Sequence, residues 1–336
     1  MTINEVAAHA HVSRQTVSNT LNFPERVRPG TLEQVRESID LLGYQPSAPS
    51  QQLRHQRAGA VGFELNAVGS TRNDVTSPFL VALAVAAPRH ACHLVPFASG
   101  DARPMLSGYS ETVQRHLVDA FVLVDTHPGD PRPTWLSERS IPWVAFGRIW
   151  NDEAATTWAD VDGRAGTAAA ADHLVEQGYE RIGFLGWPTG SAVGDDRREG
   201  WAVTTAKHGV DVTPQAACEQ GIAEATAVAG PLLDAVGRGG AIVCASDALA
   251  IGVLHAALSR GWSLGPDLGL IGFDGSNTAD MCGITTLVQP LDRIADHCLA
   301  VVHDLLDGAA PPTSGSLFEP HLIPGPSTIR NPKGTP

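Results

Sequence analysis

The residues that could do chemistry near the N-terminus gather on one face of a short predicted helix. Residues 14–21 form this helix, and Val17 and Leu21, four positions apart, point inward. The opposite side carries the polar residues Arg14, Gln15, Ser18 and Asn19. Arginine can pair with guanine, and glutamine or asparagine with adenine, in the major groove of DNA. This face therefore suits base reading, although it is equally typical of a small helical cap with a solvated surface.

Three predicted helices within residues 3–42 position this face. Thr2 and Glu5 can form a capping box before the first helix, whose apolar residues are Ile3, Val6, Ala7 and Ala10. Ser13 is a good N-cap for the second helix. We expect the third helix to begin at Thr31, to bury Leu32, Val35, Ile39 and Leu42, and to end at Gly43. Two short helices joined by a tight turn describe a helix-turn-helix.

A longer pattern of residues runs through the same region. It comprises Thr2, Ile3, Glu5, Val6, Ala7, Ala10, Val12, Ser13, Thr16, Val17, Ser18, Leu21 and Asn22, and continues through Val27, Arg28, Thr31, Val35, Leu42, Gly43, Tyr44 and Pro46. The pattern resembles the head of the LacI/GalR family of transcription repressors. This resemblance implies that the second helix lies in the major groove of operator DNA. It also implies that Arg14, Gln15 and Asn19 contact bases, and that Ser13, Thr16 and Asn22 contact phosphates.

The polar segment 47–58 contains one large apolar residue, Leu53. The resemblance implies that this segment is the hinge helix, which folds on DNA, and that Leu53 is inserted into the minor groove. Arg54 can add a phosphate contact. Pro49 departs from the family, which usually has a helix-compatible residue there. Because proline is tolerated only in a first helical turn, we expect a shorter helix that begins at or just before Pro49, and how it orders stays open.

Charge is divided unevenly along the chain. The sequence has 23 Lys and Arg against 36 Asp and Glu, a formal net charge of −13. Residues 1–57 hold six Arg and five acidic residues, a balance of +1, so the remainder carries −14. The total argues against a protein that coats nucleic acid or an anionic membrane with its whole surface. It leaves room for a local, weakly basic DNA-binding head.

The five cysteines indicate the redox compartment. They are Cys92, Cys218, Cys244, Cys282 and Cys298, with no C-x-x-C spacing. Scattered cysteines in odd number are typical of reduced thiols rather than of a disulfide framework. The sequence also shows no signal peptide pattern and no uncharged apolar segment long enough for a membrane span. We therefore expect a cytoplasmic protein with no membrane partner.

From Gly59 onward, apolar strands alternate with helical stretches. The predicted strands are 60–63, 93–97, 120–124, 143–146, 181–185, 241–245 and 268–273, and clear helices are 166–177 and 248–260. This alternation predicts an α/β core of parallel sheets covered on both faces, and ligands of such sheets bind beyond the carboxyl ends of the strands. The resemblance, strong from about Asp160, implies two doubly wound subdomains like those of periplasmic sugar-binding proteins, with the effector in the cleft between them.

The resemblance also suggests how the chain is divided. The expected parts are a head over 1–46, a hinge over 47–58, a first subdomain over 59–160 plus 290–320, a second over 161–289 plus 321–330, and a tail over 331–336.

Polar residues at the strand ends are candidate effector ligands. Asp125 and Arg148 follow predicted strands, Ser246 and Asp247 follow another, and Asp274 ends a fourth. A carboxylate at such a position can accept hydrogen bonds from sugar hydroxyls. Asp247 could equally cap the helix that follows it.

Other cleft candidates depend on the family or on aromatic chemistry. By resemblance, Arg197 is an effector-contacting arginine, Gln289 a ligand position beside the hinge, and Phe79 a cleft aromatic. Arg197 could instead pair with the adjacent acidic residues. Four tryptophans lie near these positions: Trp150, Trp158, Trp187 and Trp201. An indole packs well on a pyranose ring, and Trp187, just past a strand, is our candidate, although core packing is the usual role of a tryptophan.

Several enzyme signatures are absent from the sequence. It has no metal-binding histidine spacing, no P-loop, no dinucleotide-binding glycine motif and no G-x-S-x-G elbow. We therefore expect no catalytic residue, no metal and no cofactor.

Taken together, these observations predict a dimeric repressor that binds a pseudo-palindromic operator and responds to a mono-, di- or oligosaccharide. The absence of a C-terminal leucine heptad favours a homodimer over a tetramer. Whether the sugar acts as inducer or co-repressor stays open, as do the sugar's identity and the operator sequence. The alternatives are a sugar-binding protein of the transport type, which lacks its signal peptide here, and a doubly wound cytosolic enzyme, which lacks its catalytic residues.

Overall fold

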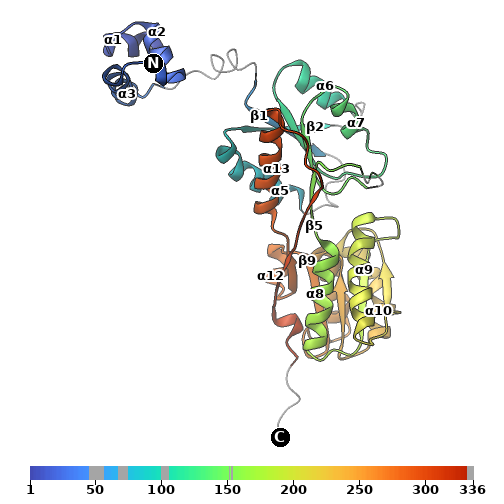
Figure 1. Ribbon diagram of the computed structural model, residues 1–336. Coiled ribbons are helices and arrows are strands. Elements are labelled where there is room, and N and C mark those ends of the chain that lie inside the picture. Colours follow the sequence, from blue (N-terminus) through green and yellow to red (C-terminus); the bar gives the residue numbers. More distant parts are fainter. Residues whose placement is uncertain (45–56, 67–74, 100–105, 151, 153, 331–336) are drawn as a thin grey trace. The chain divides into compact units, whose positions relative to one another are not determined.

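The computed structural model describes residues 1–44, 57–66, 75–99, 106–150, 152 and 154–330. The chain forms two compact units, Met1–Gly59 and Ala60–Pro336 (Figure 1). We call the first unit the head and the second the core. Within the described residues, no helix is long and apolar enough to cross a membrane.

The head is a small bundle of helices. Its elements are α1 (Ile3–His9), α2 (Arg14–Asn22), the 3₁₀ turn η1 (Pro24–Arg26) and α3 (Pro29–Leu42). Thr2 and Glu5 form the expected capping box, and the Ser13 hydroxyl caps α2. The helix α3 begins at Pro29 rather than at Thr31, because proline without an N–H is well suited to the first helical position. It ends at Gly43 with φ 58°. The fully buried side chains are Val6, Ala10, Val17 and Val35.

The first sheet of the core and its helices form what we call the first lobe. Its strands are β1 (Ala60–Asn66), β2 (His93–Ser99), β3 (Ala120–Leu123), β4 (Trp143–Phe146), β5 (Trp158–Val161) and β11 (Ser316–Phe318). Its helices are α5 (Thr76–Ala86), η3 (Ala87–His90), α6 (Ser107–Gln114), α7 (Pro131–Ser137) and α13 (Leu291–Leu306). The strand order is β11-β5-β4-β3-β1-β2, and all pairs are parallel.

Side chains of β3 alternate between the two faces of this sheet. Val122, and Val124 just after the strand, pack with α5 and α13 on one face, whereas Phe121 and Leu123 pack with α6 and α7 on the other. The strand β2 contains Pro96 and still forms, because β2 is an edge strand with one side unpaired within its sheet.

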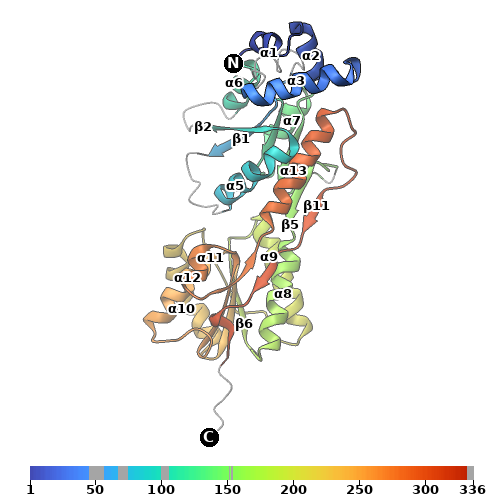
Figure 2. The ribbon, with the colours of Figure 1, turned by 90° about the vertical axis from the view of Figure 1, so that its left-hand side faces the viewer.

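The second sheet and its helices form the second lobe. Its strands are β6 (Ile182–Gly186), β7 (Gln215–Ala217), β8 (Gly240–Cys244), β9 (Leu268–Asp274), β10 (Thr285–Val288) and β12 (His321–Ile323). Its helices are α8 (Gly163–Glu176), α9 (Ala192–Lys207), α10 (Ile222–Val236), α11 (Asp247–Ser259), α12 (Asn277–Met281) and η4 (Pro326–Thr328). The order is β12-β10-β9-β8-β6-β7, with only β12 antiparallel to its neighbour. Figure 2 shows α8 and α9 on one side of this sheet and α10, α11 and α12 on the other.

The two lobes share one strand order and are connected three times. The chain leaves the first sheet after β5, returns to it after β10, and leaves it again between β11 and β12. The expected fold class, two parallel α/β sheets with a helical N-terminal head, is confirmed. Five short strands were not predicted, namely β5, β7, β10, β11 and β12, because each is only three or four residues long and contains a polar residue, whereas the equally short β3 and β4 are wholly apolar.

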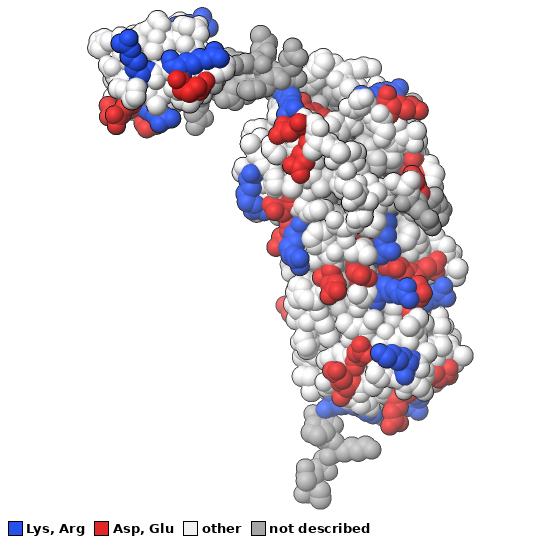
Figure 3. Space-filling model, in the orientation of Figure 1, with Lys and Arg blue, Asp and Glu red and all other residues white. Residues whose placement is uncertain are grey.

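Charged side chains of both signs are mixed on the visible surface of the core. In the view of Figure 3, Lys and Arg lie beside Asp and Glu over the described parts of both lobes. The excess negative charge of the core is therefore not gathered into one acidic face in this view.

Candidate functional site

The polar face of α2 is formed as the sequence predicted. Arg14 and Gln15 are exposed, and the Gln15 amide donates to Asn19 Oδ1 at 3.1 Å. At the start of the helix, Thr16 N donates to Ser13 Oγ at 3.1 Å, and the two hydroxyls lie 2.9 Å apart. The face thus presents a cation, two linked amides and two hydroxyls, which is a set able to contact base edges and phosphates.

The side chains of three residues predicted to contact DNA lie outside the described part of the chain. Leu53 and Arg54 lie outside the described residues, together with most of the expected hinge. Asn22 is the last residue of α2, and only its backbone is described.

A cavity of about 420 Å³ lies between the two lobes. The first lobe contributes Val75, Thr76, Val124, Asp125, Thr126, Phe146, Gly147, Trp150, Asp160 and Val161. The second lobe contributes Gly163, Trp187, Ser191, Val193, Asp196, Arg197, Gln220, Asp274 and Gln289. Many of these residues follow the carboxyl ends of parallel strands, where α/β sheets bind ligands. The volume lies within the range of small-molecule sites.

Arg197 is the buried cation of the cavity wall. Its Nη1 donates to the Ala245 carbonyl and lies 3.7 Å from Asp274 Oδ1, and its guanidinium centre is 3.6 Å from the Phe273 ring centroid. Burial lowers the pKa of Arg197, and Asp274 opposes this shift. Its Nε is buried and has no hydrogen-bond partner among the described residues. An unsatisfied buried donor is costly to the stability of the fold.

Asp274 is held in an unusual backbone conformation. Its φ is 124°, a region that residues other than glycine rarely adopt. The carboxylate accepts a hydrogen bond of 2.7 Å from Gln289 Nε2. At the corresponding strand end of the first lobe, after β4, Gly147 has φ 113°. The second lobe therefore keeps a carboxylate where the first lobe has a glycine.

A charged cluster joins the lobes beside the cavity. Arg148 follows β4 of the first lobe, and its Nη2 lies 2.9 Å from Asp196 Oδ2 on α9 of the second. Asp196 also accepts from Arg164 N at 3.1 Å. Arg148 Nε lies 3.4 Å from Asp160, and burial raises the pKa of that carboxyl to about 6, while Arg148 opposes the shift. Arg148 thus borders the cavity by holding acidic residues of its wall, and it is not itself one of the lining residues.

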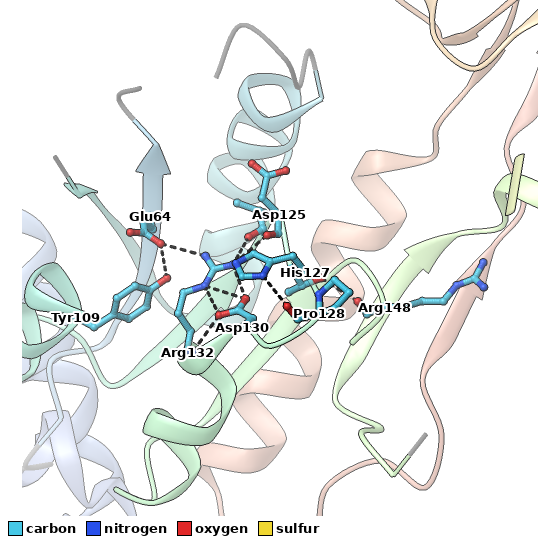
Figure 4. Close-up of polar contacts among 10 residues, drawn as sticks. Glu64, Tyr109, Asp125, His127, Pro128, Asp130, Arg132 and Arg148 are labelled. Carbon is cyan, nitrogen blue, oxygen red and sulfur yellow. Dashed lines mark hydrogen bonds and ion pairs between the residues drawn. The ribbon is translucent and has the colours of Figure 1, made fainter. Parts of the chain in front are cut away.

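A second charged network is buried inside the first lobe. Arg132, 5% exposed, reaches between Glu64 and Asp130, with distances of 3.0 Å to Glu64 Oε2 and 2.7 Å to Asp130 Oδ2 (Figure 4). The Tyr109 hydroxyl donates to Glu64 at 2.8 Å, and burial raises the pKa of this phenol. The Arg132 Nη2 also donates to the carbonyls of Val124 and Asp125, at 2.8 and 3.2 Å.

This network reaches the cavity through the backbone. Asp125 lines the cavity and has φ 52°, in the left-handed region. Because Arg132 holds the carbonyl of Asp125 and the one before it, it positions the turn from which Asp125 extends.

Gln220 is a cavity residue that the sequence analysis missed. It follows the short edge strand β7, and its Oε1 accepts from Trp187 Nε1 at 2.9 Å and from Ser246 Oγ at 2.8 Å. A strand of three residues gave no periodic signal, so nothing in the sequence marked the loop after it. Asp160 was missed because it lies on the unpredicted β5, and Asp196 because it lies within the helix α9 rather than at the end of a predicted strand.

Besides Arg148, the structure places three predicted effector ligands away from the cavity surface. Phe79 is fully buried, with its ring centroid 4.2 Å from that of Phe146, because both faces of the apolar helix α5 carry hydrophobic residues. Ser246 is buried and caps α11. The buried Asp247 carboxylate accepts from Ser276 N at 2.7 Å and Thr286 Oγ1 at 2.6 Å. We therefore leave these three out of the direct contacts.

The remaining predicted ligands do share the cavity. They are Asp125, Trp187, Arg197, Asp274 and Gln289. The arrangement combines carboxylates, amides, a buried guanidinium and indoles, which can bind a neutral polyhydroxylated molecule by hydrogen bonds and ring stacking.

Two family models match the chain. A model for bacterial regulatory proteins of the lacI family matches residues 2–47, and a model for a periplasmic binding protein-like domain matches residues 171–328. HTH-type transcriptional regulator CelR of Thermobifida fusca is 27% identical over 333 residues, which is 96% of each chain. Ribose operon repressor of Halalkalibacterium halodurans is 29% identical over 296 residues, 86% of each chain. A solved CelR–cellobiose complex has a TM-score of 0.71 at 25% identity and covers 97% of this chain and 99% of its own.

Proposed function

Because the chain belongs to the LacI family of bacterial regulatory proteins, we propose that it is a sequence-specific DNA-binding repressor controlled by a saccharide in the interlobe cavity. The observation that carries the effector proposal is the cavity itself, where carboxylates and a buried guanidinium face indole rings. Two similar proteins support this proposal. A solved structure of CelR is a complex with cellobiose, and another relative is named as the repressor of a ribose operon. The proposed activity is not enzymatic, and it places the protein in the cytoplasm with its operator.

The head supplies the DNA contacts in this proposal. Arg14, Gln15 and Asn19 read bases, while Ser13, Thr16 and Asn22 contact phosphates. The segment 47–58 is the hinge, with Leu53 and Arg54 on the minor groove side. We divide the core as the sequence suggested, into a first subdomain of 59–160 plus 290–320 and a second of 161–289 plus 321–330.

The effector contacts come from both lobes. In the proposal, Asp274, Gln289 and Arg197 bind hydroxyl groups, Trp187 packs against a sugar ring, and Asp125 closes the site from the first lobe. Arg148 acts through Asp160 and Asp196. Effector binding couples to DNA binding because the two lobes, which both contact the effector, adopt a different relative position when it is bound.

A homodimer completes the proposal, since a pseudo-palindromic operator needs two heads. The helix α5 offers an apolar outer surface for this contact, where Val81 is 63% and Val85 65% exposed. Exposed aliphatic residues four positions apart on one helix are suited to pack against their copies in a second chain.

The experiment that tests the proposal uses the full chain. DNA sites are selected from a random pool, and operator binding and thermal unfolding are then measured with a saccharide panel that includes cellobiose and ribose. A true effector at 100 times its Kd stabilises the fold by about 2.7 kcal/mol and changes operator affinity in the same titration. The direction of that change separates an inducer from a co-repressor.

The Arg14→Ala variant is the matched control for this experiment. Arg14 is exposed, so its loss should leave folding and saccharide binding unchanged while removing operator preference. A chain that selects no DNA sequence, or whose operator affinity no saccharide alters, would overturn the proposal.

A further inference from the structure

We propose that Gln220 determines effector specificity by presenting its amide N–H groups to an oxygen that serves only as an acceptor. The proposal rests on the proposed function, because it concerns how the same cavity recognises a saccharide. The recognised group is a ring or glycosidic oxygen, which has no hydrogen to donate.

The neighbours of Gln220 determine which way its amide points. The indole Nε1 of Trp187 can only donate, so the Gln220 atom 2.9 Å from it must be the oxygen. The Ser246 hydroxyl lies 2.8 Å from the same oxygen. Ser246 Oγ accepts from Leu249 N at 3.3 Å, and its hydrogen is therefore available for Gln220. A flipped amide would place its NH₂ group against the indole donor, so this orientation is unique.

The nitrogen of this amide is left for the ligand. Gln220 is half-buried and lines the cavity, and its Nε2 has no hydrogen-bond partner within the described part of the chain. Because the oxygen is already held by two donors from the loops after β6 and β8, the NH₂ group is held in place before any effector binds. A donor held in place loses little entropy on binding.

The rest of the cavity makes this donor distinctive. Asp125, Asp160, Asp196 and Asp274 are all carboxyl groups of the lining, suited to receive hydroxyl hydrogens. An ether oxygen has no hydrogen to give them, and it needs a donor from the wall. Other donors of the described lining are the Arg197 guanidinium, which itself lies 5.4 Å from the Trp187 ring centroid, the Gln289 amide, the Trp150 indole and the hydroxyls of Thr76 and Ser191. Gln220 differs from them because two hydrogen bonds to its oxygen fix the direction of its NH₂ group.

The test compares variants of the full chain with analogues of the effector found in the saccharide panel. Gln220→Glu keeps an oxygen for Trp187 and Ser246 but has no N–H to offer when ionised, and Gln220→Met removes both. Each analogue replaces one effector oxygen, by hydrogen or fluorine at a hydroxyl and by CH₂ at a ring or glycosidic position. Affinities come from calorimetry, and thermal unfolding without effector reports whether each variant is folded.

We expect both variants to bind the parent effector about tenfold more weakly than the wild type. For the wild type, replacing one particular effector oxygen by CH₂ should lower the affinity about tenfold. For Gln220→Met, the same replacement should leave the affinity unchanged. Ser246→Ala, which removes one of the two donors to Oε1 but not the NH₂ group, should stay within about threefold of the wild type.

Two results would overturn the proposal. Gln220→Glu binding the parent as tightly as the wild type would show that the residue only ties the loops together. An analogue series with the same losses in the wild type and Gln220→Met would show that no effector oxygen depends on this amide. If the wild type binds no saccharide, the proposed function itself fails, and the two failures are thereby distinguished.

Discussion

The two lobes of the core repeat one strand order but build their cavity walls differently. The second lobe holds its wall largely by hydrogen bonds of side-chain amides, as in the Trp187–Gln220–Ser246 set and the Gln289–Asp274 pair. The first lobe holds its wall from behind, through the buried ion network centred on Arg132. The difference shows that one lobe presents most of the polar recognition groups at the surface of the cavity, while the other uses its charges to shape the backbone.

The clearest single difference lies at the corresponding ends of β4 and β9. Gly147 and Asp274 share a positive φ, of 113° and 124°. Glycine adopts this conformation at little cost, whereas aspartate is strained there. The strain in the second lobe accompanies a carboxylate that faces the cavity, which is the pattern expected where binding rather than stability has selected the residue.

The largest expected effect is a loss of stability when the buried ion network of the first lobe is disrupted. Arg132→Met should lower the free energy of unfolding by about 3–5 kcal/mol, because it leaves the buried Glu64 and Asp130 carboxylates without their cation. Urea denaturation measures the loss. Arg139→Met, at an exposed cation on the same lobe, is the control and should change stability little. Equal effects of the two variants would contradict a structural role for the buried network.

The next effect tests the point where the lobes meet. The Asp160 carboxyl has a pKa of about 6 in the folded chain against 3.8 as its ordinary value, so the folded chain binds the proton more tightly. The contribution of Asp160 to the free energy of unfolding is fully present below pH 3.8 and is lost as the pH rises toward 6. Relative to Asp160→Asn, the wild type should lose up to about 3 kcal/mol across this window.

Urea denaturation at several pH values measures this difference. The control is Asp267→Asn, because Arg238 holds the pKa of Asp267 below its ordinary value. The stability from Asp267 is present above its ordinary pKa and is lost as the pH falls. A wild-type-to-Asp160→Asn difference that is flat, or that grows toward low pH, would refute the buried-acid interpretation.

A third prediction tests whether the second lobe binds the effector through Asp274. Asp274→Ala should weaken the effector about 100-fold, since it removes a carboxylate partner of both Arg197 and the ligand. Operator binding without effector should persist, because the head is a separate unit. Calorimetry and operator titration measure the two properties. A variant that the saccharide still regulates normally would remove Asp274 from the site.

The smallest expected effect sharpens the backbone comparison. Asp274→Gly should be about 1 kcal/mol more stable than Asp274→Ala, because only glycine relaxes at this φ. Gly147→Ala should lose a similar amount relative to the wild type. Thermal unfolding of the free chain measures both differences. Equal stability of the glycine and alanine variants would show that the two strand ends are not strained.

Much of this arrangement could be predicted from the sequence where the signal is local. Thr2, Ser13 and Gly43 mark helix ends through their own side-chain or backbone chemistry. Long apolar strands identify the sheets. Polar residues at the carboxyl ends of these strands, such as Asp125 and Asp274, could therefore be predicted to line the cavity.

The rest of the site depends on long-range packing. Gln220 comes after a strand too short to recognise, and Phe79 lies on a helix whose two faces are both apolar, so its direction could not be read from periodicity. The pairing of Arg148 with Asp196 joins residues on different sheets, and only the folded core brings them together.

The triple connection between the lobes has a consequence for synthesis on the ribosome. The helix α13, which packs on α5 and on the first sheet, comes after nearly all of the second lobe. At the usual rate of translation, the apolar side of β3 and α5 stays without α13 for roughly 10–40 s after α5 has been synthesised. The strands β6 to β10 and their helices are meanwhile complete. The nascent first lobe is therefore the part of this chain most exposed to aggregation, and the one most in need of chaperones.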